Sequence, residues 1–186
     1  MGSMERADAA RNRAKVLAAA DRLFAAGDPR RVTMDAIARE AGVGRGTLYR
    51  RYPDIPSIAM ALLDEHERAL QEKLLGGEPP LGPGAPPPRR LAAFYAAMTD
   101  LLEQHVHLTL GAESGSARFA TGAYGFWHAH VRMLVREAGV PGPDALVDIL
   151  LAPLAPELFA YQRGRGRGVE EIKSALRTLA ERTLAG

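Results

Sequence analysis

The segment 41–54, AGVGRGTLYRRYPD, gathers side chains that can donate hydrogen bonds to anionic oxygens. Its donors are three guanidinium groups and three hydroxyl groups, on Arg45, Arg50, Arg51, Thr47, Tyr49 and Tyr52. An arginine fork binds a phosphate or a guanine edge through two hydrogen bonds, and a hydroxyl group adds a single one. The segment also has Gly44 and Gly46, although glycine inside a helix costs about 1 kcal/mol relative to alanine. A short basic helix whose backbone approaches an anionic partner closely would explain both features.

Residues 33–52 have the spacing of a helix-turn-helix, in which two short helices are joined by a tight turn. Thr33 is expected to cap the first helix, and Asp35 lies in its first turn, where the helix dipole favours a negative charge. Ala38 supplies the small residue that a close helix crossing needs, and Gly42 tolerates the positive φ of the turn. The apolar anchors are Ile37, Ala41, Val43 and Leu48. The alternative interpretation is an ordinary pair of antiparallel helices.

The second helix of this motif, about residues 45–51, is expected to have one exposed face and one buried face. Arg45 and Tyr49 are four residues apart and therefore share a face, whereas Leu48 points toward the core. In a DNA-binding helix-turn-helix, the second helix enters the major groove, where its first residues meet base edges. The predicted DNA-binding residues are Thr33, Arg45, Gly46, Thr47, Tyr49 and Arg50. Arg45 and Thr47 suit base edges, and the other side chains suit phosphates.

The stretch TMDAIAREAGVGRGTLYRRYPD resembles the DNA-binding signature of the tetracycline-repressor (TetR) family of transcriptional regulators. The preceding stretch KVLAAADRLFAAG resembles the first helix of that family, so the resemblance covers residues 11–63. It implies a homodimeric all-α regulator with a small-molecule pocket in its C-terminal domain. It also implies DNA contacts at Thr33, Arg45, Thr47, Tyr49 and Arg50. Two positions depart from the pattern, because Gly44 replaces a frequent serine and Ile55-Pro56 replaces a frequent phosphate-binding lysine.

Composition narrows the class of protein. The chain has 186 residues, of which 47% are apolar, as expected for a globular protein. It has no cysteine, which excludes disulfides and thiolate metal sites and agrees with a reducing, cytoplasmic location. No apolar run approaches the roughly 18–20 residues of a membrane span, so no membrane partner is predicted. Residues 5–52 hold 11 basic and 6 acidic residues, a net charge of +5, which predicts an anionic partner or a solvated arginine-rich surface.

Helical periodicity runs along nearly the whole chain, and strand signals are almost absent. The expected fold is all-α, with about eight or nine helices. A three-helix helix-turn-helix domain is predicted over residues 5–54, and a helical domain for ligand binding and dimerisation over residues 55–186. Helices are expected at residues 11–26, 34–41, 45–51, 57–75, 89–109, 122–138, 143–162 and 168–184. Pro153 and Pro156 should bend the seventh, and a Gly/Pro-rich loop spans residues 76–88.

Two stripes at helical spacing combine aromatic, methionine and histidine side chains. The predicted ligand-binding residues are Phe94, Tyr95, Met98, His105, Tyr124, Trp127, His128 and Val131. An apolar pocket with a few polar groups is typical of small-ligand sites, so we expect a small apolar or aromatic effector. The same stripes suit an ordinary core, and His105 equally suits a buried hydrogen bond. No metal or other cofactor is predicted, because the pairs 105/107 and 128/130 are two residues apart, whereas helical metal ligands are four apart.

The last two expected helices carry more apolar surface than one chain needs for its own core. Residues 144–162 are apolar almost all round, which predicts burial on several sides. The family resemblance places the dimer interface on these two helices. The predicted interface residues are Leu150, Leu154, Leu158, Tyr161, Ile172, Leu176 and Leu179. The basic stretch RGRGRG at residues 163–168 is interpreted as the loop between the two helices.

These observations predict a DNA-binding transcriptional regulator. The specific form is a repressor that binds a palindromic operator as a homodimer and is released by a small-molecule effector. The alternatives are a helical small-molecule-binding or enzymatic protein with an incidental basic hairpin, and a protein that binds DNA without sequence preference. An enzyme is not predicted, because the chain has no cysteine nucleophile, phosphate-cradling glycine loop or carboxylate–histidine motif at catalytic spacing.

Overall fold

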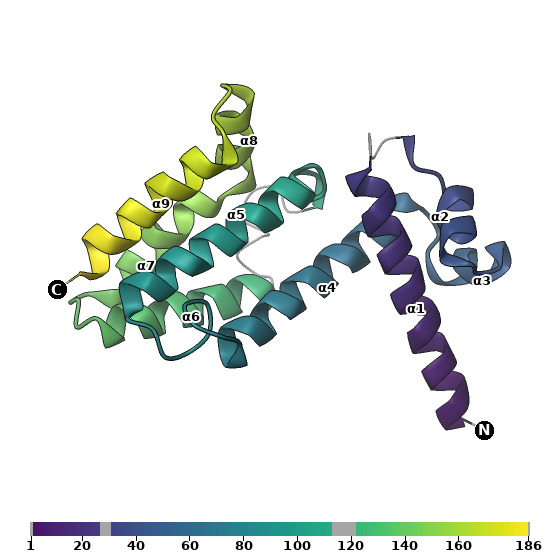
Figure 1. Cartoon of the computed structure of the whole chain (residues 1–186), viewed down its shortest axis with the longest axis horizontal. Coiled ribbons are helices and arrows are strands. Elements are labelled where there is room, and N and C mark those ends of the chain that lie inside the picture. Colours follow the sequence, from purple (N-terminus) through teal and green to yellow (C-terminus); the bar gives the residue numbers. More distant parts are fainter. Residues whose placement is uncertain (1, 27–30, 113–121, 186) are drawn as a thin grey trace. The chain divides into compact units, whose positions relative to one another are not determined.

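The computed structural model describes residues 2–26, 31–112 and 122–185, with side chains described for residues 7–26, 31–105 and 122–185. Every regular element within these ranges is a helix, which confirms the predicted all-α fold (Figure 1). The chain divides into two compact units, Met1–Glu65 and His66–Gly186. The helix that contains residues 65 and 66 contributes to both units, and each unit is described by itself below.

The first unit contains α1 (Gly2–Ala25), α2 (Met34–Ala41), α3 (Arg45–Arg51) and the first half of α4 (Ile55–Gly76). The bounds of α2 and α3 agree with the prediction, whereas α1 begins well before residue 11. Residues 2–10 lack an apolar stripe, so periodicity does not reveal them as helix. They are nevertheless rich in alanine, methionine, glutamate and arginine, which have high helix propensity.

Hydrogen bonds and one glycine conformation define the ends of α2. The Thr33 hydroxyl accepts a hydrogen bond from the Ala36 amide at 3.2 Å, which confirms Thr33 as the N-cap. Gly42 ends the helix with a φ of 64°, as the turn of a helix-turn-helix requires. Its amide donates to the Arg39 carbonyl, and the Val43 amide donates to the Ala38 carbonyl. A residue with a Cβ atom would be strained at position 42.

The next two helices begin with different caps. Gly44 caps α3 through its backbone alone, with no side-chain hydrogen bond. At the start of α4, the Asp54 carboxylate accepts hydrogen bonds from the Ser57 hydroxyl at 2.5 Å and from the Ser57 amide at 2.8 Å. These two bonds lower the pKa of the Asp54 carboxyl. Gly44 thus marks the start of α3, and the hydrogen bonds of Asp54 mark the start of α4.

We expect replacement of Thr33 by alanine to lower the free energy of unfolding of the first unit by about 1 kcal/mol. The alanine leaves the Ala36 amide without the partner that Thr33 provides. Hydrogen exchange of the α2 amides in the full chain measures this loss locally. Thr33→Ser is the matched control because it retains the hydroxyl group. Equal acceleration of exchange in both variants would contradict a role for the cap.

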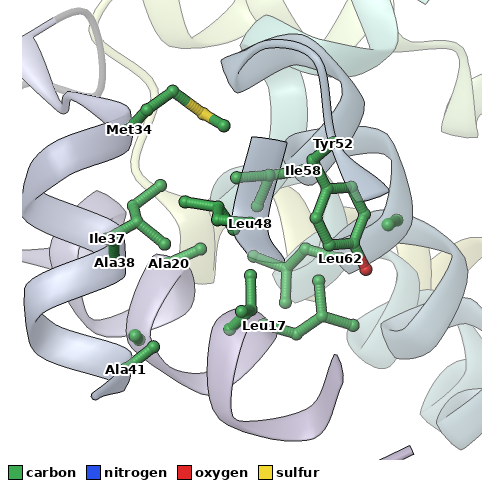
Figure 2. Close-up of a cluster of buried hydrophobic side chains, with 13 residues drawn as sticks. Leu17, Ala20, Met34, Ile37, Ala38, Ala41, Leu48, Tyr52, Ile58 and Leu62 are labelled. Carbon is green, nitrogen blue, oxygen red and sulfur yellow. The ribbon is translucent and has the colours of Figure 1, made fainter. Parts of the chain in front are cut away.

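A cluster of buried apolar side chains holds the helices of the first unit together (Figure 2). It includes small residues on α1 and α2, such as Ala20 and Ala38, which allow close packing. In Figure 2 the Leu48 side chain extends from α3 into the middle of this cluster. Leu48 is 2% exposed, and it is the buried residue of α3. Tyr52, which follows that helix, is also buried.

The second unit contains the rest of α4, followed by α5 (Pro87–Ala112), α6 (Gly122–Glu137), α7 (Pro143–Leu151), α8 (Pro156–Gly164) and α9 (Val169–Leu184). In Figure 1, α9 lies alongside α5, against which it packs. The expected bend after residue 150 is a complete break, with a 3₁₀ turn at Ala152–Leu154 between α7 and α8. Pro153 and Pro156 lack amide hydrogens, so the α-helical ladder does not continue through them.

Polar contacts link helices within the second unit. The Tyr95 hydroxyl donates to the Leu150 carbonyl at 2.8 Å, and burial raises the pKa of this phenol. The Arg163 guanidinium binds both oxygens of the Glu103 carboxylate, at 3.0 and 2.9 Å. Lys173 contacts the carboxylate of Asp100 at 2.6 Å, a contact that raises the pKa of the ammonium group. Within the described ranges, none of the helices combines the length and the apolar character of a membrane span.

Candidate nucleic-acid interface

The predicted DNA-binding residues all lie in the first unit and are exposed. Thr33 lies at the start of α2, and the other five belong to α3: Arg45, Gly46, Thr47, Tyr49 and Arg50. Tyr49 is 49% exposed. Leu48 is buried in the same helix. The fold therefore anchors α3 through one side and presents its hydrogen-bond donors on the other.

The guanidinium group of Arg45 is paired with the carboxylate of Asp35, with 2.8 Å between Nη2 and Oδ2. The Arg45 and Asp35 side chains are 71% and 48% exposed. An exposed ion pair contributes only about 0–1 kcal/mol, whereas a bidentate arginine–guanine contact contributes about 1–3 kcal/mol. The pair thus links the start of α3 to α2 without preventing Arg45 from binding a base. The sequence pattern indicated only a helix-dipole role for Asp35.

Thr47 and Arg50 also interact with each other. Nη2 of Arg50 donates to the Thr47 hydroxyl oxygen at 3.4 Å, a long and therefore weak hydrogen bond. A hydroxyl group that accepts a hydrogen bond still has its own hydrogen to donate. Thr47 is thus available as a donor to a base or a phosphate oxygen.

Two arginines on α1 connect that helix to the rest of the first unit. Arg13 donates to the Tyr52 hydroxyl at 3.3 Å and to the Glu65 carboxylate at 3.3 Å. Arg22 contacts the Glu40 carboxylate of α2 at 3.0 Å. No local pattern reveals such contacts, because Arg13 is 39 residues from Tyr52 and 52 residues from Glu65.

Most of the predicted ligand-binding residues lie in the core of the second unit. The buried ones are Phe94, Tyr95, Met98, His105, Trp127 and Val131, and the half-exposed ones are Tyr124 and His128. The rings of Phe94 and Trp127 are 5.8 Å apart. His105 is buried, and its Nε2 lies 2.7 Å from Nδ1 of the partly exposed His66, at hydrogen-bond distance. The side chain of residue 107, considered with His105 as a metal pair, lies outside the described residues.

His130 was not among the predicted ligand-binding residues, and the spacing of the pair 128/130 excluded it as a metal ligand. It is buried next to Phe94, with 5.4 Å between the ring centroids. Burial, followed by the charge of Arg90, lowers the pKa of His130 to about 4. Within the described part of the chain, its Nε2 has no hydrogen-bond partner. The helical position of residue 130, one turn after Phe126 and Trp127, is a weak indication of this burial.

The predicted dimer-interface residues fall into two groups. Leu150, Leu154, Ile172 and Leu176 are buried within the chain itself. Leu158 and Tyr161 on α8 are 39% and 58% exposed, and Leu179 is half-buried. Ile149 on α7, which was not predicted, is 65% exposed. The apolar pattern thus identifies buried faces, but it does not tell whether the same chain or a partner covers them.

A family model described as bacterial regulatory proteins, tetR family, matches residues 16–61. An uncharacterised HTH-type transcriptional regulator from Mycobacterium bovis is 51% identical over 49 residues, which are 26% of this chain and 26% of the relative. One from Mycobacterium tuberculosis is 49% identical over 49 residues, again 26% of each chain. The matched segment thus spans about a quarter of the length of these curated relatives.

The fold resembles solved structures along nearly the whole chain. A TetR-like transcriptional regulator from Rhodococcus sp. RHA1 is 18% identical with a TM-score of 0.61, over 94% of this chain and 96% of that one. A TetR-family transcriptional regulator from Streptomyces coelicolor is 16% identical with a TM-score of 0.51, over 95% and 97%. At these identities the likeness concerns the fold, and the sequence match concerns the first unit. The sequence match thus places residues 16–61 in the tetR family of bacterial regulatory proteins, and the structural likeness shows that the chain shares the fold of these solved structures.

Proposed function

We propose that this chain is a transcriptional regulator that binds double-stranded DNA through α3. The observation that carries the proposal is the exposed set of donors on a helix held by Leu48. A helix of this kind fits the major groove, where Arg45 binds guanine and Thr47 contacts an adjacent base. Tyr49 and Arg50 bind phosphates, and Thr33 adds a further phosphate contact from the start of α2. Because Gly44 has no side chain, base recognition depends mainly on Arg45 and Thr47.

The proposed assembly is a homodimer on a palindromic operator. Two recognition helices about 34 Å apart would read successive major grooves on one side of the DNA. The exposed Leu158 and Tyr161 of α8 supply apolar surface for the contact between subunits. The other predicted interface residues of α7–α9 support this surface from within the chain. The cytoplasm is the proposed location.

The proposed effector is a small apolar or aromatic molecule that binds the second unit and releases the repressor from DNA. The aromatic residues of α5 and α6 would contact it, among them Phe94, Tyr124 and Trp127. The effector must bind the released state more tightly than the DNA-bound state, because only such a difference shifts the equilibrium. α4 belongs to both units and is the element through which the two sites would influence each other.

The test starts with selection of an operator from random DNA by the full-length protein. For the selected sequence, we expect Arg45→Ala to raise Kd by about 5- to 150-fold, which corresponds to about 1–3 kcal/mol. Arg45→Ala should also lose the wild type's preference for the base pair that Arg45 contacts. Tyr49→Phe, which removes one hydroxyl group, should weaken binding to all sequences alike. Arg182→Ala, an exposed arginine on α9, is the charge-matched control and should bind as the wild type does.

The outcome also distinguishes a regulator from a protein that binds DNA without sequence preference. Both lose affinity as salt rises, but only a regulator retains a large ratio of specific to non-specific affinity. If the wild type and both α3 variants bind all DNA sequences with equal affinity, the proposal is wrong. Binding that depends only on the number of arginines would instead weaken Arg45→Ala and the control Arg182→Ala equally, and that result would also contradict the proposal.

A further inference from the structure

A hollow of about 460 Å³ lies in the first unit between α1 and α3. Its volume falls within the range of about 300–1,000 Å³ that is typical of small-molecule sites. Val16, Leu48 and Tyr52 lie beneath it and are almost fully buried, whereas Ala9 and the half-buried Val43 present apolar surface to it. Its rim is polar and includes three arginines. Such a combination of an apolar floor and a few polar groups suits an amphipathic molecule.

The charges around the rim favour an anion. Asp8 is the acidic residue among those that line the hollow, and its carboxylate is paired with Arg11. Arg13 is bound to Tyr52 and to Glu65. The guanidinium group of Arg51, by contrast, makes no ion pair or hydrogen bond within the described residues. A guanidinium group with all its donors available binds a carboxylate through two parallel hydrogen bonds.

We propose that this hollow is a second ligand site, which binds an aromatic carboxylate. The ring would lie on Ala9 and Val43, above the buried Leu48 and Tyr52. The carboxylate would bind Arg51 at the rim. Burial of the ring provides affinity, and the guanidinium group selects an acid over a neutral molecule of the same shape.

Occupancy of this site would compete directly with DNA. Thr47 and Arg50 line the hollow, and both are proposed DNA-binding residues. A ligand in contact with them would exclude the phosphate or base that they bind. This consequence rests on the proposed function, whereas binding of the carboxylate does not. It also differs from an effector in the second unit, because the competition needs no change of conformation.

Two neighbouring alanines of α1 provide a matched pair of variants. Ala9 and Ala10 are both exposed, but only Ala9 lines the hollow. Ala9→Phe should fill the hollow with a ring, and Ala10→Phe places the same ring outside it. Arg51→Gln removes the charge from the rim. Thermal unfolding of both phenylalanine variants at the wild-type temperature would show that neither disturbs the fold.

The probe is 2-naphthoate, added to ¹⁵N-labelled full-length protein whose amide chemical shifts are followed by NMR. We expect saturable shifts at Val43 and Leu48 in the wild type and in Ala10→Phe. Kd should rise by about tenfold or more in Ala9→Phe and in Arg51→Gln, where a charge-assisted hydrogen bond is lost. The neutral analogue 2-naphthalenemethanol should also bind at least about tenfold more weakly than the acid. Unchanged positions of these two amide signals, or equal binding by Ala9→Phe, would overturn the site.

Anisotropy of labelled operator DNA tests the competition. Naphthoate should raise the apparent Kd for DNA in the wild type and in Ala10→Phe, but not in Ala9→Phe. Amide shifts without any effect on DNA binding would overturn the competition and leave the ligand site standing. If the protein does not bind DNA at all, the proposed function fails, and the NMR result alone decides the site.

Discussion

Replacing Leu48 with alanine is expected to abolish specific DNA binding and to lower the free energy of unfolding of the first unit by about 2–5 kcal/mol. Leu48 is the buried side chain of α3, and it lies in the middle of the core cluster (Figure 2). A helix of seven residues is not stable by itself in water. Without this anchor, α3 loses its packing against α1 and α2, and its exposed donors lose their fixed positions.

Hydrogen exchange measures this effect where it arises. The Tyr52 amide donates to the Leu48 carbonyl at 2.9 Å, so its exchange reports on the end of α3. Leu48→Ala should accelerate exchange there while the α9 amides of the second unit exchange as in the wild type. Leu48→Met is the control, since a swap that conserves volume costs less than about 1.5 kcal/mol. Equal protection of Tyr52 in Leu48→Ala and in the wild type would show that α3 does not depend on this residue.

The helix-turn-helix could be predicted in detail because its requirements are local. Gly42 is needed for the positive φ of the turn, and Thr33 for the cap of α2. The spacing of Ile37, Ala41 and Leu48 follows from two helices that share one core. Each requirement restricts one position to a few residue types, so the residues identify the motif and its bounds together. The DNA contacts remain predictions until binding is measured.

The contacts between distant segments could not be predicted. The pair of Arg45 with Asp35 depends on how α2 and α3 cross, and that of Arg13 with Glu65 on where α4 returns to α1. Both involve exposed charges, which have many alternative partners in the sequence. The hollow between α1 and α3 could not be predicted either, because its lining combines residues from two helices that are distant in the sequence.

The second unit could be predicted only as a set of helices. Amphipathic spacing shows that Leu150, Ile172 and Leu176 face apolar surroundings, but it does not identify the covering surface. In the structure these residues are buried within their own chain, whereas Tyr161 is exposed. The family model ends at residue 61, so the family pattern offers no guide to this region. Effector and dimer contacts there depend on packing between several helices.

His130 shows how packing in the second unit changes the chemistry of a side chain. It is buried on α6 beside Phe94, and the positive charge of Arg90 acts on it. Arg90 is itself buried, with its Nη1 3.5 Å from the Glu137 carboxylate. Burial, and then the charge of Arg90, lowers the pKa of the imidazole from 6.5 to about 4. The neutral form is therefore the one that the folded unit accommodates.

Lowering the pH from about 7.5 to about 4.5 is expected to cost the second unit about 2–3 kcal/mol of stability through His130 alone. Between pH 6.5 and about 4 the unfolded chain binds a proton at this residue and the folded chain does not, so stability falls as pH falls. Urea unfolding of the full chain across this range measures the effect. In His130→Gln this loss should disappear, whereas His128→Gln, on the same helix, should retain it. A pH-dependence that is identical in the wild type and His130→Gln would mean that the buried imidazole does not oppose protonation.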